Sequence, residues 1–243
     1  MAQTFIFNHP YYPQEESIPG YVPNVTPVTV LLACFGTVLG VVLSVTVTVA
    51  RRWNPSLTFS DQLYLCWFAL CGFLHCFFEG YFIVNHETLP ASQNLFAQLW
   101  KEYALSDSRY MTSDPFMLCV ESITVLFWGP LCWAAAGCIA TGNSLRYVLQ
   151  VIVCLAHLYG VALYYSTCYA EYRYLGVSHS RPEFLYYWVY YVGFNLPWVV
   201  VPAIILLRSI QAIQGVFIAL GKMERTLRIA NISRHGKESK KSN

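Results

Sequence analysis

Charged residues are scarce in this chain of 243 residues: Lys, Arg, Asp and Glu make up 12% of it, against 56% apolar residues. A soluble domain carries about 25% charged residues because its surface must be solvated, so this composition excludes an ordinary soluble enzyme. The formal net charge is only +2. So few basic residues cannot form the basic face of a nucleic-acid-binding protein. We therefore expect a membrane protein that binds no nucleic acid.

Several motifs of soluble enzymes are also missing. The sequence has no GxGxxG motif, no P-loop, no HExxH motif and no serine nucleophile elbow, which excludes the common nucleotide-binding and zinc-peptidase patterns. Nine cysteines form an odd number without a CxxC pair. Because free cysteine behaves as a small buried apolar residue, we expect neither a disulfide framework nor a metal site.

Five long apolar segments predict the fold. They comprise residues 28–50, 62–85, 115–142, 147–167 and 184–207. Each is long enough for a helix to cross a bilayer core, which takes roughly 20 residues, whereas the strands of a membrane barrel have about ten. We expect an all-α polytopic membrane protein, a five-transmembrane-helix bundle over residues 28–208. An N-terminal tail (1–27) precedes this domain and a basic tail (209–243) follows it.

The basic residues are distributed unevenly between the two ends of these segments. One side holds eleven of the fifteen, namely Arg51, Arg52, Arg146 and the eight from Arg208 to Lys241. Because basic residues concentrate on the cytoplasmic side, we expect a lumenal N-terminus and a cytosolic C-terminus. Lys240 and Lys241, fourth and third from the end, are similar to a dilysine retrieval signal, which predicts the endoplasmic reticulum membrane. A basic tail beside anionic lipid is the other interpretation.

Only two of the thirteen acidic residues, Glu79 and Glu121, fall inside the five segments. An ionisable group at membrane depth costs on the order of 3 kcal/mol, so such residues are functional candidates. On a helix His75 lies one turn from Glu79. Thr124 and Trp128 share the helical face of Glu121. These five side chains are the first candidates for a site.

Asn195 and Trp198 in the fifth segment are three residues apart, and Pro197 between them removes a backbone hydrogen bond and permits a bend. Two carboxyl groups and an imidazole buried together can give a proton and take one back, and an indole face can stabilise a cation formed in between. We expect proton transfer on an apolar substrate that enters from the bilayer. An interhelical hydrogen-bond cluster and a proton-coupled transporter are the alternatives.

Several ordered blocks of the sequence resemble the emopamil-binding protein family, whose members are sterol Δ8-to-Δ7 isomerases of the endoplasmic reticulum. Residues 65–80, which include His75 and Glu79, are similar to the second span of that family. The resemblance covers about residues 8–208. It continues through residues 9–13, 22–24, 98–103, 107–110, 121–124, 126–130 and 195–198.

The resemblance implies a five-helix fold with a membrane-embedded pocket. The sterol would be protonated at C9, a cation would form at C8, and a proton would leave C7. His75 and Glu79 would form the proton donor and shuttle. Glu121, with Thr124 and Asn195, would provide the second carboxyl group or stabilise the cation. The resemblance leaves open which group is the acid and which is the base.

The resemblance also implies the surroundings of the reaction. Trp198 would face the cation, where Trp128 is a second aromatic candidate, and Tyr103 and Tyr110, with Arg109 nearby, would lie at the lumenal mouth. No metal or redox cofactor is implied, because a double-bond shift involves no net oxidation. The implied partners are a sterol substrate from the bilayer, cationic amphiphilic drugs as ligands, and a second copy of the chain in a homodimer.

The fourth segment departs from the family pattern. His157 stands where the family pattern has Gln, and Val161 stands where animal members carry Asp. If these side chains contact the substrate, the chain could be an isomerase or cyclase acting on another polycyclic isoprenoid. A noncatalytic sterol- or amphiphile-binding protein of the same superfamily is the remaining alternative.

Overall fold

The structure, a computed structural model, describes residues 9–239 and is all-helical over that range, without a strand. Five helical rods are long and apolar enough to cross a membrane, which confirms the predicted fold class. The rods are α1 (Val28–Trp53); α2 (Phe59–Phe73), η1 (Leu74–Glu79) and α3 (Gly80–Asn85); α5 (Pro115–Ile123), η4 (Thr124–Trp128) and α6 (Gly129–Ala140); α7 (Leu145–Leu175); and η5 (Leu185–Gly193) with α8 (Pro197–Ser239).

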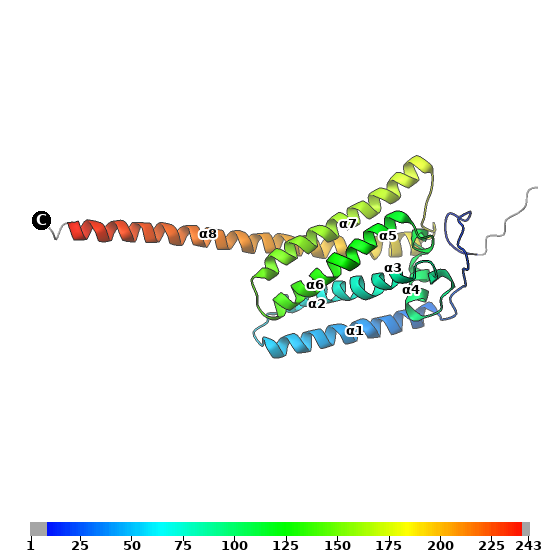
Figure 1. Ribbon diagram of the computed structural model, residues 1–243, viewed down its shortest axis with the longest axis horizontal. Coiled ribbons are helices and arrows are strands. Elements are labelled where there is room, and N and C mark those ends of the chain that lie inside the picture. Colours follow the sequence, from blue (N-terminus) through cyan, green and yellow to red (C-terminus); the bar gives the residue numbers. More distant parts are fainter. Residues whose placement is uncertain (1–8, 240–243) are drawn as a thin grey trace, which may run out of the picture.

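The rods lie roughly side by side, with α1 at one edge of the bundle and α7 at the other (Figure 1). The second and third rods form its centre, where α2 packs against α6. They approach closely because glycines face large groups. A Cβ atom at Gly72 would lie 2.9 Å from the Trp133 ring, and one at Gly129 would lie 2.6 Å from Cys76 Sγ and 3.2 Å from His75 Cβ. Gly129 thus permits the third rod to contact the second at the level of His75.

Capping residues determine where two of the central rods begin. Thr58 Oγ1 accepts the backbone N–H of Asp61 at 3.1 Å, and Asp61 Oδ2 accepts the backbone N–H of Thr58 at 3.3 Å, a reciprocal capping box. Asp114 caps α5 by accepting the N–H of Met117, and Pro115 occupies the first helical position. These caps fix the starts of the rods that carry Glu79 and Glu121.

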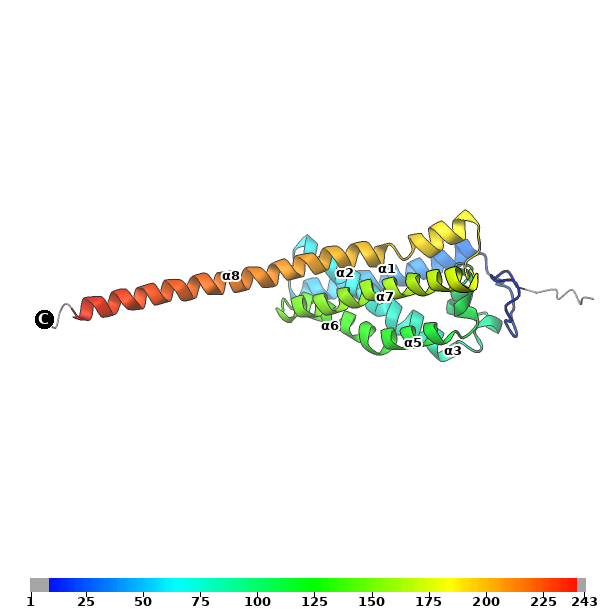
Figure 2. The same ribbon diagram turned by 90° about the horizontal axis from the view of Figure 1, so that it is seen from above.

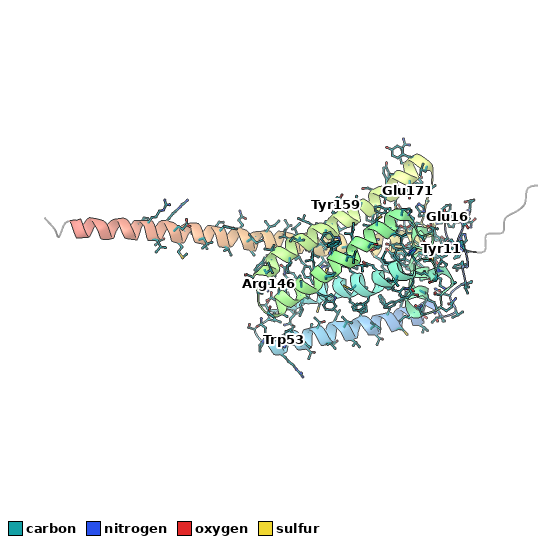
Figure 3. All side chains as sticks on the ribbon, in the orientation of Figure 1. Tyr11, Glu16, Trp53, Arg146, Tyr159 and Glu171 are labelled. Atoms are coloured by element: carbon teal, nitrogen blue, oxygen red, sulfur yellow. The ribbon has the colours of Figure 1, made fainter. Side chains whose placement is uncertain are left out.

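One end of the bundle is covered by the N-terminal segment, α4 (Leu95–Tyr103) and two 3-10 turns, η2 (Leu89–Ala91) and η3 (Ser108–Met111). The Tyr11 hydroxyl donates to the backbone oxygen of Lys101 at 3.0 Å, and the Asn24 amide donates to that of Gln98 at 2.8 Å. Figure 3 shows Tyr11, Glu16 and Glu171 at this end and Trp53 and Arg146 at the opposite end. The N-terminal segment is therefore a folded part of the bundle end from residue 9 onward.

The fifth rod is interrupted at residues 194–196, just before Pro197, which is where the sequence predicts a bend (Figure 2). After this break α8 runs along the bundle and continues far past it, to Ser239 (Figure 1). The expected fifth segment ended at residue 207. No proline follows Leu207 to end the helix. Lys240 and Lys241, the residues of the predicted retrieval signal, lie outside the described residues.

Two apolar clusters fill the bundle. One surrounds Phe68, Cys132 and Ile205, towards the end that carries Arg146. The other surrounds Phe82 and Trp100, towards the end covered by α4. His75 lies between Phe68 and Phe82 on the second rod, so the polar residues of interest occupy the layer between the two apolar clusters.

Candidate active site

Three rods change from α-helical to π-helical hydrogen bonding near the predicted site residues. The π-helical segment η1 includes both His75 and Glu79, η4 begins at Thr124, and η5 ends two residues before Asn195. Single π-helical turns inside α-helices are rare and occur frequently at functional sites. η1 and η4 also contact each other. These two irregular segments therefore meet at one level of the bundle.

His75 is the centre of this level, with 4% of its surface exposed. Its Nδ1 atom lies 2.9 Å and 2.8 Å from the two carboxylate oxygens of Glu79. Its Nε2 atom lies 3.0 Å from Nε2 of His157, which comes from α7. A carboxylate accepts hydrogen bonds, so Nδ1 of His75 carries a proton and Glu79 fixes the orientation of the ring. The other ring nitrogen is then available on the side of His157.

Glu121 is the second carboxyl group at this site and is buried, with 8% of its surface exposed, whereas Glu79 is half-buried. The Tyr110 hydroxyl donates to its Oε1 atom at 2.8 Å. Glu121 is also close enough to interact electrostatically with Glu79 and His75. We call His75, Glu79, Tyr110, Glu121 and His157 the helix cluster. It joins two carboxyl groups and two imidazoles. The sequence spacing alone predicts only the contact between His75 and Glu79.

Two tyrosines come from the loop between the second and third rods: Tyr110 belongs to the helix cluster, and the Tyr103 ring lies 5.5 Å from that of Tyr110. Burial, and the nearby charge of Glu121, raise the pKa of Tyr110 well above its usual value. Burial likewise raises the pKa of Tyr103, whose hydroxyl interacts with the Asn195 side chain. Both hydroxyls therefore stay protonated, and that of Tyr110 is the donor to Glu121. Tyr110 lies deeper than a position at the mouth of a pocket would require, since only 5% of its surface is exposed.

Aromatic rings line the side of His157. The Trp67 ring lies edge-on to the imidazole of His157, with 6.3 Å between centroids, and the half-buried Trp198 ring lies 5.3 Å from that of Trp67. Trp198 therefore adjoins the helix cluster through Trp67. Trp67 Nε1 and His157 Nδ1 are both buried without a hydrogen-bond partner. Such atoms cost about 1–3 kcal/mol each unless a ligand or water bonds to them.

Three of the predicted site residues form no hydrogen bond with Glu79 or Glu121 in the described part of the chain. The Thr124 hydroxyl donates to the backbone oxygen of Val120 in its own helix at 2.9 Å. Asn195 donates to the backbone oxygen of Tyr191 at 2.8 Å. Trp128 is half-buried at the end of η4. The expectation that Trp128 shares the face of Glu121 assumed an unbroken α-helix, and the π-helical segment η4 removes that assumption.

A separate group of charged residues lies between the loop and α7. Arg109 donates from Nε and Nη2 to both carboxylate oxygens of Asp107, at 3.0 Å and 2.7 Å, and from Nη1 to the Thr167 hydroxyl at 3.2 Å. It also contacts Cys168 Sγ at 2.7 Å. Burial alone would lower the pKa of Arg109, but the hydrogen bonds and charge of Asp107 raise it. We call these four residues the loop cluster.

The helix cluster has the components of an acid–base site. One imidazole and two carboxyl groups lie within reach of one another, and a tyrosine hydroxyl donates to one of the carboxyls. Such a set can deliver a proton to a bound molecule and accept one from it. Two hollows in the described part of the chain, one against Ser44 and one beside Gly176, lie away from it.

Comparison with known proteins shows similarity to one family. The model of the family described as EBP, the EXPERA (expanded EBP superfamily) family, matches residues 95–209. A 3-beta-hydroxysteroid-Delta(8),Delta(7)-isomerase of Cavia porcellus is 36% identical, over 85% of this chain and 90% of that protein. A probable isomerase of the same name from Oryza sativa subsp. japonica is 36% identical, over 86% and 94%. An isomeliandiol synthase of Melia azedarach is 38% identical, over 68% and 76%.

Proposed function

The chain belongs to the EXPERA family, the expanded EBP superfamily, and from this premise we propose that it is a sterol isomerase that moves a ring double bond from Δ8 to Δ7. The observation that carries this proposal is the helix cluster, a set of acid and base groups buried inside five membrane-spanning rods. The similarity to sterol isomerases over most of the chain supports the substrate class. The enzyme is an isomerase that transposes a C=C bond.

The first step is protonation of the double bond. His75 is the group from which C9 receives a proton: its imidazolium form, held by Glu79 through Nδ1, gives up the proton on Nε2. The π electron pair forms the new C9–H bond and leaves a carbocation at C8. Glu79 keeps the imidazole ring oriented and supplies a negative charge beside it. His75 is thus the proton donor and Glu79 the positioning and shuttle group.

The second step is loss of a proton from C7. The electron pair of the C7–H bond becomes the Δ7 double bond and neutralises the cation, while the proton passes to the second carboxyl, Glu121. Tyr110, which donates to Glu121, orients that carboxyl. Return of this proton from Glu121, by way of Glu79, to His75 restores the starting state, and Glu121 interacts with both residues. The cycle consumes no proton, metal or redox equivalent.

Between the two steps the positive charge needs stabilisation. The indole faces of Trp67 and Trp198 are the electron-rich surfaces nearest to His157, and a cation over an indole gains about 0.5–2 kcal/mol. Thr124, Asn195, Trp128 and Tyr103 border the substrate in this proposal. The same surfaces suit cationic amphiphilic compounds, which would compete with the sterol for the site.

We further propose that the chain resides in the endoplasmic reticulum membrane with its N-terminus in the lumen. Supporting this, Arg51, Arg52 and Arg146 all lie at the bundle end from which α8 leaves, and basic residues favour the cytosolic side. We propose a homodimer as its assembly state. Each of these properties can be tested independently of the reaction.

Expression in cells that lack Δ8-to-Δ7 isomerase tests the proposed reaction. The chain should convert accumulated Δ8 sterols to Δ7 sterols, as measured by gas chromatography with mass spectrometry. An empty vector provides the baseline, and immunoblotting with detergent gel filtration establishes that the chain is inserted and folded. Persistent Δ8 sterols in cells with folded protein would refute a sterol substrate.

A second substrate class is favoured by one observation. His157, which departs from the family pattern, lies 3.0 Å from His75 and leaves its Nδ1 atom without a partner. A substrate bearing a polar group at that point would bond to this nitrogen. The similarity to an isomeliandiol synthase supports an oxygenated polycyclic isoprenoid as that alternative substrate. Purified chain incubated with Δ8 sterols and with such isoprenoids would distinguish the two by which product forms.

A further inference from the structure

Four metal-ligating side chains from three rods, one of them His75, converge at one point of the bundle. Cys71 Sγ and one ring nitrogen each of His75 and His157 lie within 4.8 Å of one another. Cys132 Sγ lies 4.0 Å from Nε2 of His157, and Cys132 also interacts with Cys71. Cys71 and Cys132 have no exposed surface. From this juxtaposition we propose that the chain binds one zinc ion through Cys71, His75, Cys132 and His157.

Two separations among these atoms, from His75 to His157 and from His157 to Cys132, are close to those of a tetrahedral zinc site. Zn–N bonds of about 2.0 Å and Zn–S bonds of about 2.3 Å place two nitrogens about 3.3 Å apart and a nitrogen and a sulfur about 3.6 Å apart. The two Nε2 atoms are 3.0 Å apart, and Nε2 of His157 and Cys132 Sγ are 4.0 Å apart. These two pairs thus lie within about 0.4 Å of the ideal separations, and Cys71 Sγ, which lies within 4.8 Å of both nitrogens, would move inward to complete the site.

The hydrogen bonds around His75 suit a metal ligand. Histidines that bind zinc usually donate their other ring N–H to a carboxylate, which fixes the tautomer. Glu79 already accepts from Nδ1 of His75 and leaves the Nε2 lone pair directed at His157. The Nδ1 atom of His157 is unpartnered, so it can carry the ring proton while Nε2 binds the ion.

The charge balance suits the membrane interior. Binding of Zn²⁺ releases one proton from each thiol, and the ring proton of His157 moves from Nε2 to Nδ1. Two thiolates and two neutral imidazoles then cancel the charge of the ion. The ion and its four ligands then carry no net charge, which avoids the large cost of a lone Zn²⁺ ion at membrane depth.

The four residues are far apart in the sequence, which explains why ligand spacing alone predicts no metal site. Only Cys71 and His75 belong to the same rod, four residues apart, whereas Cys132 and His157 come from α6 and α7. The zinc ion would bind Nε2 of His75, the nitrogen that faces His157 and that donates the proton in the proposed reaction. If the proposed isomerase function holds, zinc is therefore an inhibitor of the reaction.

Zinc binding can be measured on the full chain purified in detergent and freed of metal with a chelator. We expect about one Zn²⁺ per chain in competition with a chromophoric chelator. Co²⁺ in the same site should give thiolate charge-transfer bands and the visible bands of a tetrahedral ion. Cys71→Ser and Cys132→Ser should each weaken zinc binding at least about 100-fold, since loss of outer-shell partners alone costs about 10- to 100-fold.

Cys138→Ser is the matched control, because this half-buried thiol lies on the same helix as Cys132 but outside the cluster. It should bind zinc as the unaltered chain does. Zinc binding that is absent, or that survives in the Cys71→Ser/Cys132→Ser double variant, would overturn the proposal. Gel filtration of each variant establishes that it is folded.

The isomerase assay adds a second readout that rests on the proposed function. Zinc should inhibit the unaltered chain, a chelator should restore its rate, and Cys71→Ser should be active and resistant to zinc. Normal zinc binding in a chain that isomerises no sterol would leave the site established and refute the proposed function. Inhibition of Cys71→Ser equal to that of the unaltered chain would refute the role of this site in inhibition.

Discussion

The helix cluster and the loop cluster are both buried and both contain charged side chains, but they differ in how completely their atoms are bonded. In the loop cluster each guanidinium nitrogen of Arg109 donates a hydrogen bond, and both carboxylate oxygens of Asp107 accept. In the helix cluster, by contrast, the Nδ1 atom of His157 is buried without a partner. A fully bonded cluster holds elements together, whereas one with unpartnered atoms can bind something else.

The backbone differs between the two clusters as well. Asp107 caps the short turn η3 and Thr167 lies in the regular helix α7. In the helix cluster His75 and Glu79 lie in the π-helical segment η1, whereas Glu121 and His157 lie in the regular helices α5 and α7. A π-helical turn inside an α-helix is frequent at functional sites, and here it carries the proposed proton donor and its partner. We therefore assign a structural role to the loop cluster and a catalytic role to the helix cluster.

Removal of the central imidazole should have the largest effect on activity. His75→Ala deletes the proposed proton donor and is expected to lower the isomerisation rate by about 10²- to 10⁴-fold, the usual contribution of a general acid or base. Sterol chromatography on purified chain measures the rate, and retained binding of a cationic amphiphile reports a folded site. His86→Ala, which removes a histidine bonded to Ser113 outside the cluster, should keep the full rate.

The largest effect on stability is expected from the loop cluster. Arg109→Met leaves Asp107 charged, buried and unpaired, which should lower the free energy of unfolding by about 3–5 kcal/mol. Thermal unfolding in detergent, followed by fluorescence-detected gel filtration, measures the change. Arg181→Gln, which removes an exposed ion pair with Glu183, should leave the unfolding temperature unchanged. Equal effects of the two variants would end the structural role assigned to Arg109.

A smaller loss of activity is expected when the tyrosine of the helix cluster is altered. Tyr110→Phe removes the hydroxyl that donates to Glu121. A hydrogen bond to a charged group contributes about 1.5–3 kcal/mol, which corresponds to a rate loss of about 10- to 150-fold if the bond orients the base during reaction. The isomerisation rate at saturating sterol is the measurement. An unchanged rate would remove Tyr110 from the proposed mechanism.

The smallest effect is expected at Trp198, which adjoins the cluster only through Trp67. If its indole stabilises the cation, Trp198→Leu should lose more rate than Trp198→Phe, by up to about tenfold, because a phenyl ring retains part of the cation–π attraction. Rates of both variants at saturating sterol decide this. Equal losses would indicate packing alone.

The sequence predicts the five rods well, because their long apolar runs determine membrane spans directly. It also predicts that His75 and Glu79 meet, because a spacing of four places them one helical turn apart. The pairing of His157 with His75 is not predictable in this way, since the two residues lie on different rods. The only signal for His157 was its departure from the family pattern, together with its position inside an apolar segment.

The π-helical segments and the Tyr110–Glu121 bond were also beyond the reach of the sequence patterns. Helical periodicity assumes an unbroken α-helix, whereas the third rod changes its hydrogen bonding at Thr124, where it packs against the second rod. Tyr110 reaches Glu121 from a loop turn, whose position depends on the packing of α4. Both features depend on tertiary contacts, so neither leaves a periodic pattern.

A matched pair of carboxylate-to-amide substitutions tests the division between the two clusters most directly. The measurement is the initial rate of Δ7 sterol formation per folded chain for Glu79→Gln and Asp107→Asn, with the unfolding temperature of each. Glu79→Gln should lose at least about 100-fold in rate with little change in unfolding temperature. Asp107→Asn should unfold at a lower temperature while its folded chains keep the unaltered rate. A Glu79→Gln chain with full activity, or folded Asp107→Asn chains that lose as much rate, would contradict the account.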